Sequence, residues 1–208
     1  YNNNSVMRSY IFSYTQKTLI SLDLKSLDYI PDLITELPTS SDDNKTFYFS
    51  LKENVKWDDG TLLTAEDVIF STKIMLCHLT NNSQIRPIYN SVIESITADP
   101  NNPLKFSMRA LNINWTAKTI LGGIYLQQKS YWDPKGLLDN ISFDQILSRS
   151  FAETEEIVDW FNDFNNADNS FKPENLKGLG PYVVSEWEAS QYITSVSYTH
   201  LTLPTNVA

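Results

Sequence analysis

Residues 46–67 constrain the fold more than any other segment, because they specify three consecutive elements and the boundaries between them. Over residues 46–52 apolar and polar side chains alternate, which is the period of a strand with one buried face. Asp58-Asp59-Gly60 is typical of a tight turn, since glycine tolerates a positive φ. Thr64 is a suitable N-cap, and Asp67 at N3 completes a capping box. The segment therefore predicts a half-buried strand, a turn and a capped helix.

The other elements are predicted from apolar periodicity and from turn residues. The helix after Thr64 is expected to continue to the Asn81-Asn82-Ser83 run. Ser150 and Glu153 form a second capping-box pattern, which predicts a helix behind them with one acidic, wetted face. Further helices are expected over 6–19 and, interrupted at Gly122-Gly123, over 116–126. Strands are expected over 92–97, 104–111 and 182–187, and a polar linker over 165–173. This mixture predicts an α/β fold with α+β mixed sheets.

Composition and charge exclude several classes of protein. The chain has 208 residues, of which 41% are hydrophobic and 12% aromatic, as in a folded globular protein. The net charge of −9 disfavours binding to nucleic acid, because phosphates would be repelled. No apolar run reaches the length of about 18 residues that a membrane-spanning helix needs.

The sequence offers little for catalysis or metal binding. Cys77 and His78 are neighbours on the predicted helix and point in different directions, so we interpret Cys77 as a small buried residue and His78 as structural. Asp58 and Asp59, close to Trp57, leave a carbohydrate-active enzyme open as an alternative, since glycosidases use paired carboxylates and aromatic platforms. A carbohydrate-binding surface module is a further alternative. We expect no catalytic residue, no metal site and no cofactor.

The last residues are predicted to be foreign to the protein. Residues 196–205 read like the conceptual translation of a transposase-type sequencing adapter. We therefore assign 196–208 to an artefactual tail and expect the natural sequence to stop near Ser195. Because the chain starts at Tyr1, we also expect its true beginning to be missing.

Three motifs resemble one known family. Residues 47–68 closely resemble the signature of oligopeptide- and dipeptide-type solute-binding proteins, which runs aromatic-x-Phe-x-Leu-Arg through Asp-Gly to Thr-Ala-x-Asp-Val. Residues 31–36 resemble the Pro-x-Leu-Ala-Glu segment before it, and residues 178–188 the later Gly-Thr-Gly-Pro-Tyr … Trp-Glu segment. The resemblance covers about 5–195. Departures from the pattern are Lys52 for arginine, Leu62 for proline and Leu179 for threonine.

The resemblance implies a substrate-binding component of an ABC importer, which captures peptides or a related small solute outside the cytoplasmic membrane. Its partners would be the solute and the permease subunits, and it would touch the membrane only through a missing N-terminal anchor. The implied architecture is part of a two-lobe periplasmic-binding-protein fold. Residues 1–20 and 176–195 would belong to the hinge-proximal lobe and 21–175 to an accessory α/β domain.

The resemblance also assigns residues. Asn3 and Asn4 are the expected cleft-lining, ligand-binding residues in this segment. The motif residues are expected to act in the fold instead, through turn and cap chemistry: Trp57, Asp59, Gly60, Thr64, Asp67, Gly178, Gly180, Pro181 and Tyr182.

Overall fold

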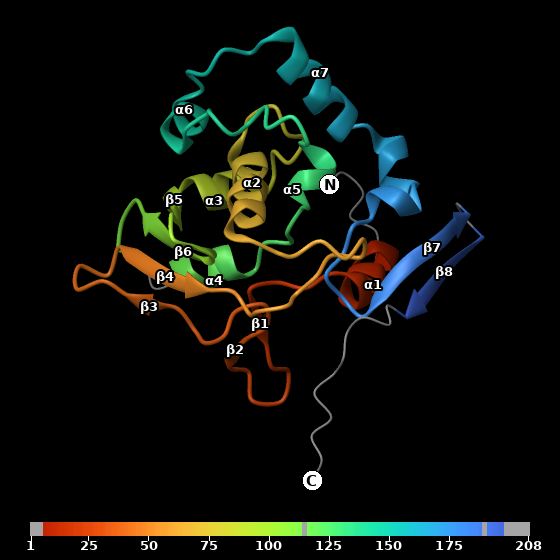
Figure 1. The fold of residues 1–208 in the computed structure, drawn as a ribbon, viewed down its shortest axis with the longest axis horizontal. Helices are drawn as coiled ribbons and strands as arrows, with labels where there is room; N and C mark the ends of the chain where they lie inside the picture. The colour runs from red at the N-terminus through yellow and green to blue at the C-terminus, as the bar shows by residue number, and fades with distance from the viewer. Residues whose placement is uncertain (1–5, 114–115, 189–190, 198–208) are drawn as a thin grey trace.

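The computed structural model describes residues 6–113, 116–188 and 191–197, in which helices and antiparallel strands alternate irregularly (Figure 1). Asn3 and Asn4 lie outside the described residues, as does the tail beyond Ser197. The helices are α1 (Val6–Thr15), α2 (Ala65–Leu76), α3 (Arg86–Asn90), α4 (Ala117–Gly122), α5 (Lys129–Trp132), α6 (Phe143–Ser148) and α7 (Glu155–Phe164). The strands are β1 (Ile20–Leu22), β2 (Tyr29–Pro31), β3 (Thr39–Ser40), β4 (Thr46–Ser50), β5 (Ile93–Asp99), β6 (Asn102–Ala110), β7 (Tyr182–Glu188) and β8 (Tyr192–Ser197).

The main sheet has four antiparallel strands in the order β3-β4-β6-β5. The alternation in β4 is as predicted, since Phe47 and Phe49 are buried whereas Tyr48 is 52% exposed. Phe49 pairs with Phe106 across β4 and β6, and their rings stack with centroids 4.9 Å apart. One face of the sheet therefore carries the apolar side chains that form the core.

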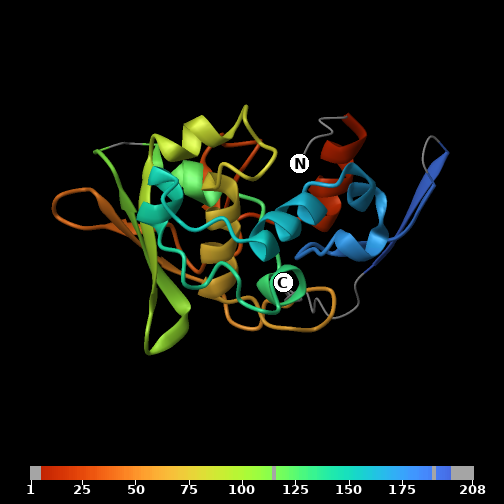
Figure 2. The ribbon, with the colours of Figure 1, turned by 90° about the horizontal axis from the view of Figure 1, so that it is seen from above.

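Helix α2 packs on that inner face and is the centre of the main core (Figure 2). Ten of its 12 residues are buried, including the polar Ser71 and Thr72, whose hydroxyls donate to backbone oxygens one turn earlier. The helices α5 and α7 lie on the side of α2 away from the sheet, whereas α6 contacts β5 (Figure 2). Such all-round burial explains why the helix has apolar residues on more than one face.

The two ends of the chain form a smaller unit beside this core. Helix α1 packs against the β7–β8 hairpin, and Ile11, Leu176 and Val184 make a second buried cluster separate from the main one. Figure 2 shows α1 and the hairpin at the opposite end of the molecule from the main sheet. Segments far apart in sequence thus meet in one unit. The mixed α/β fold class is confirmed, and the strand pairings of the described residues are antiparallel.

Three predicted helices are shorter than expected, and one of them, α4, ends at Gly122, where the sequence places an interruption. Helix α2 ends at Leu76, because the side chains of Thr80 and Asn82 donate to the carbonyls of Ile74 and Met75 and replace the bonds of a further turn. Helix α1 ends at Thr15 instead of residue 19, and the carbonyl of Thr15 accepts from Gly180. The prediction that Cys77 and His78 lie inside a helix is therefore wrong.

Ser150 and Glu153 do not form the predicted capping box, and the second capping box of the described residues is Ser142–Gln145 at the start of α6. Helix α7 begins at Glu155, and its N-cap is Thr154, whose hydroxyl accepts from the backbone of Ile157. Residues 150–153 instead cross from α6 to α7, with Phe151 buried. The expected linker 165–173 also contains the 3₁₀ turn η1 (Ala167–Phe171), and η2 (Pro173–Asn175) follows at its end.

Candidate functional site

The turn after β4 is built around a buried tryptophan. Trp57 is fully buried, and its backbone oxygen accepts from Gly60, which has a φ of +87°. Asp59 accepts from the backbone N–H and the hydroxyl of Thr61 at 2.9 and 2.7 Å. Gln128 donates to Asp59 and to Thr61, both at 2.7 Å, so the turn is tied to the segment before α5. Asp59 and Gly60 thus both help to hold the backbone of the turn.

Asp67 links three elements at the start of α2. Its carboxylate accepts from the backbone N–H of Thr64 at 3.0 Å, which closes the predicted capping box. It also accepts from the backbone N–H of Lys129 at 2.9 Å and from the indole N–H of Trp57 at 3.5 Å. Burial nevertheless raises the pKa of Asp67 above its ordinary value, because desolvation outweighs these donors. The carboxylate therefore joins α2, α5 and the turn.

Lys177 joins the turn after β4 to the smaller unit formed by α1 and the β7–β8 hairpin. Its ammonium lies 3.6 Å from a carboxylate oxygen of Asp58 and 4.8 Å from the centre of the Tyr131 ring. The carbonyl of Lys177 accepts from the side chain of Gln16, and Tyr131 donates to Asn175 at 2.6 Å. Burial raises the pKa of Asp58 in spite of Lys177, since desolvation is the larger effect.

The glycines of the last motif lie against α1. Gly180 donates its backbone N–H to Thr15 at 2.9 Å. A Cβ at Gly178 would overlap the carbonyl oxygen of Thr15, and one at Gly180 would lie 2.6 Å from the Thr15 carbonyl carbon. Pro181 is exposed, and Tyr182 contacts Tyr14 edge to face. The motif thus allows two backbone segments of the smaller unit, α1 and residues 178–180, to approach each other closely.

Asp58 and Asp59, which left a carbohydrate-active enzyme open, and Asp67 are all engaged in this framework. Asp58 faces Lys177, Asp59 is bound by Thr61 and Gln128, and Asp67 caps α2. Within the described ranges no group of three or more His, Cys, Asp or Glu side chains is arranged to hold a metal ion.

The Cys77–His78 pair is structural as well. Cys77 is buried, and burial raises the pKa of its thiol to about 11, so the nucleophilic thiolate is suppressed. His78 lies 2.7 Å from Glu153. The sequence did not predict the residues that bind the aspartates of the framework, which are Lys177, Gln128 and Lys129. Their contacts join segments far apart in the chain and leave no local pattern.

Comparison with known proteins identifies this framework. The family model for the middle region of the bacterial extracellular solute-binding proteins, family 5, matches residues 28–201. The chain belongs to that family. Its resemblance to oligopeptide-type binding proteins, predicted from the motifs, is thereby confirmed. No match is found among the curated proteins.

Solved structures similar to this family 5 chain carry the same fold. The oligopeptide-binding protein AppA from Bacillus subtilis, in complex with a nonapeptide, is 18% identical with a TM-score of 0.67 over 95% of this chain and 33% of its own. NikZ from Campylobacter jejuni, in complex with Ni(L-His), is 22% identical with a TM-score of 0.64, over 91% of this chain and 31% of its own. An oligopeptide-binding protein from Thermus thermophilus, complexed with a pentapeptide, is 16% identical with a TM-score of 0.66, over 96% and 34%.

The family 5 chain therefore spans about a third of the length of these relatives and has part of the solute-binding-protein fold. None of the helices in the described ranges has the length and apolarity needed to cross a membrane. The family is one of extracellular proteins, which gives the location of its members.

Proposed function

We propose that the protein is the substrate-binding component of an ABC importer, and that it captures peptides outside the cytoplasmic membrane and delivers them to permease subunits. The family match over residues 28–201 carries this proposal. Agreement of the fold with proteins crystallised with a nonapeptide and a pentapeptide supports peptide as the solute class. A related small solute is the alternative ligand, because a relative of equal similarity holds Ni(L-His).

The domain assignment follows from the same proposal. Residues 1–20 and 176–195 contribute to the hinge-proximal lobe, and residues 21–175 form the accessory domain. The separate apolar cluster of α1 and the β7–β8 hairpin supports this division. The close backbone contact between Thr15 and Gly180 supports a fixed crossing of the two chain segments at the boundary.

The proposal assigns binding without turnover. Asn3 and Asn4, at the start of the chain, line the ligand cleft, and the motif residues from Trp57 to Tyr182 shape the framework. A lipid anchor ahead of Tyr1 holds the protein at the membrane. An upstream signal peptide with a lipobox cysteine in the continuous genomic reading frame, next to permease genes, is the expected finding.

Isothermal titration of the full-length protein with di- to pentapeptides tests the proposal. Saturable heat with at least one peptide length is expected, and Ni²⁺ with histidine serves as the comparison solute. If heat is seen only with the nickel–histidine complex, the ligand is a metal chelate and not a peptide. The absence of heat with any peptide would refute the peptide assignment. Hydrolysis of glycans by the protein, lost in the variant Asp59→Asn, would instead favour the alternative of a carbohydrate-active enzyme.

A further inference from the structure

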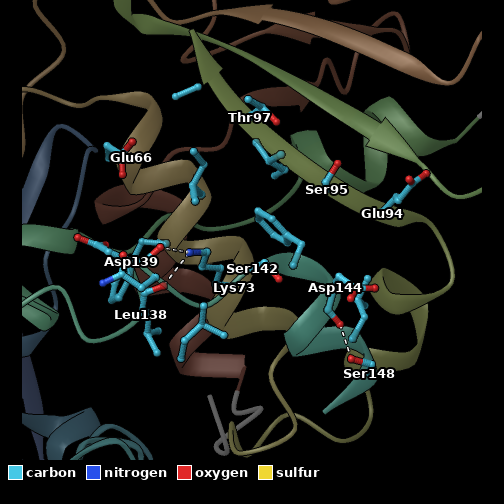
Figure 3. A pocket seen from close by; sticks show the side chains of 18 of the residues that line it. Glu66, Lys73, Glu94, Ser95, Thr97, Leu138, Asp139, Ser142, Asp144 and Ser148 are labelled. Atoms are coloured by element: carbon cyan, nitrogen blue, oxygen red, sulfur yellow. Dashed lines mark hydrogen bonds between the residues drawn. The ribbon is translucent and has the colours of Figure 1, made fainter. Parts of the chain in front are cut away.

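A groove runs along one edge of the main sheet, away from the smaller unit of α1 and the β7–β8 hairpin. It is a cavity of about 1030 Å³ between β5, α2 and residues 138–148 (Figure 3). Its apolar lining comes from all three, and includes Ile69, Phe70, Ile96, Leu138, Phe143 and Leu147. We call it the edge groove. Its volume is typical of sites that hold ligands, which are about 300–1,000 Å³.

The wall that β5 contributes is an open sheet edge. β5 is the last strand in the order β3-β4-β6-β5, and residues 94–98 line the groove without interruption. Every second residue of an edge strand directs its N–H and C=O away from the neighbouring strand. In the described part of the chain, residues 94–98 make no backbone hydrogen bond outside the pairing with β6. The groove therefore presents unpaired backbone donors and acceptors beside an apolar floor.

The charges of the edge groove are unbalanced. Its lining holds four carboxylates, Glu66, Glu94, Asp139 and Asp144, but only two ammonium groups. Both ammonium groups are occupied. Lys73 is buried and donates to the carbonyls of Leu138 and Asp139 at 2.7 and 3.2 Å, and Lys129 pairs with Glu66 and Asp139 at 3.2 and 2.7 Å.

Asp144 is the carboxylate left over. It is exposed in the first turn of α6, and within the described residues it has no ion pair, whereas Glu94 lies 3.3 Å from Arg109. Figure 3 shows Asp144 across the groove from Ser95 and Glu94 on β5. A cationic side chain entering here would find an unneutralised partner within a net negative rim.

We propose that the edge groove binds an extended peptide segment carrying a basic side chain, which adds to β5 as a fifth strand of the main sheet. Backbone hydrogen bonds to residues 94–98 hold the segment, the apolar floor takes its inward side chains, and Asp144 receives the basic one. This second peptide site lies wholly within the accessory domain and differs from the cleft of the proposed function.

Fluorescence anisotropy of the 208-residue chain with short labelled peptides tests the proposal. The probe is Lys-Val-Thr-Val-Lys-amide with fluorescein attached to its N-terminal amine through a glycine, and a version with Glu for both Lys tests the charge. Two further versions are N-methylated on one or the other alternating set of amides, because only one set can face β5. Binding of the parent peptide is expected, with at least about tenfold weaker binding of the Glu version and of one methylated version. Equal binding of all four peptides, or none at millimolar concentration, refutes the site.

A charge-reversal variant locates the binding. Asp144→Lys should weaken the parent peptide about fivefold or more and strengthen the Glu version. The matched control is Glu155→Lys, which reverses an exposed first-turn carboxylate of α7 outside the groove and should leave binding unchanged. Circular dichroism confirms that both variants remain folded. Equal loss in both variants would mean a general charge effect and would refute the groove.

Hydrogen exchange supplies a readout that does not depend on variants. Saturation with the parent peptide should slow exchange of amides in residues 94–98 and leave the β7–β8 hairpin unchanged. Protection confined to the hairpin or α1 would refute the edge groove. Protection of residues 94–98 without peptide, together with a dimer in sedimentation, would make a second copy of the chain the occupant and refute the peptide. Asp144→Lys in the full-length protein should leave the peptide affinity of the ligand cleft unchanged. Failure of the edge groove can therefore be distinguished from failure of the proposed function.

Discussion

Single residues of the smaller unit are constrained by backbone contact. Gly178 and Gly180 lie against the carbonyl group of Thr15, where a Cβ has no room. Gly178→Ala and Gly180→Ala should each lower the free energy of unfolding by about 1–3 kcal/mol, since overpacking forces the backbones apart. Urea denaturation measures this. Gly123→Ala is the control, because its Cβ would meet no atom closer than 3.4 Å, and an equal loss there would contradict the explanation.

Two adjacent aspartates should affect stability with opposite dependence on pH. Burial raises the pKa of Asp58 above 3.8, so the folded state holds its proton more tightly and the stability it contributes falls as pH rises through that raised pKa. Burial alone would also raise the pKa of Asp59, but hydrogen bonds from Thr61 and Gln128 hold it below 3.8. The stability contributed by Asp59 is therefore present above pH 3.8 and lost as pH falls through the lowered pKa.

Thermal unfolding of Asp58→Asn and Asp59→Asn between about pH 2 and 7 tests these signs. The stability advantage of the wild type over Asp59→Asn should grow with rising pH, and its advantage over Asp58→Asn should shrink. Parallel curves for the two variants would show that other titrating groups, and not these carboxylates, set the pH dependence.

At the level of elements, the sequence predicts correctly those features that depend on residues close together in the chain. The alternation of β4 and the Thr64–Asp67 cap of α2 are local, and both occur at the expected positions. The end of α2 depends on Thr80 and Asn82, whose side chains donate to carbonyls of the helix from outside it. Apolar periodicity contains no sign of these contacts, so it predicted a helix that is too long. The Ser150–Glu153 pattern failed because Thr154, and not Ser150, caps the first turn of α7 by accepting from the backbone of Ile157. Contacts such as Asp58–Lys177 bridge distant segments, and no local pattern encodes them.

Helix α2 also positions the loop that leads to α6. Lys73 donates from α2 to the carbonyls of Leu138 and Asp139, and burial lowers the pKa of its ammonium. Lys73→Met should lower the free energy of unfolding by about 1–3 kcal/mol, because it leaves two backbone acceptors without a donor. Lys135→Met is the control, since Lys135 forms an exposed pair with Glu156, and surface pairs of this kind contribute little. Chemical denaturation compares the two, and equal losses would contradict a special role for Lys73.

Across the whole molecule, the separation into two apolar clusters predicts two levels of stability. The cluster of α1 and the β7–β8 hairpin has, among the described residues, only three buried members, Ile11, Leu176 and Val184, whereas the sheet and α2 share a far larger core. Local opening is easiest where few apolar contacts hold a segment. Amides of β7 and β8 should therefore exchange with solvent faster than amides of β4 and β6 in the native protein.

Two matched variants test whether the units open independently. Val184→Ala removes two methyl groups from the small cluster and should speed exchange in the hairpin and α1 about tenfold, equivalent to about 1.4 kcal/mol, without changing β4 or β6. Val68→Ala makes the same change in α2, where the side chain is fully buried, and should speed exchange in the sheet. If Val184→Ala accelerated exchange in the sheet and hairpin alike, the two units would unfold as one, and the proposed boundaries at residues 20 and 176 would mark no separate domain.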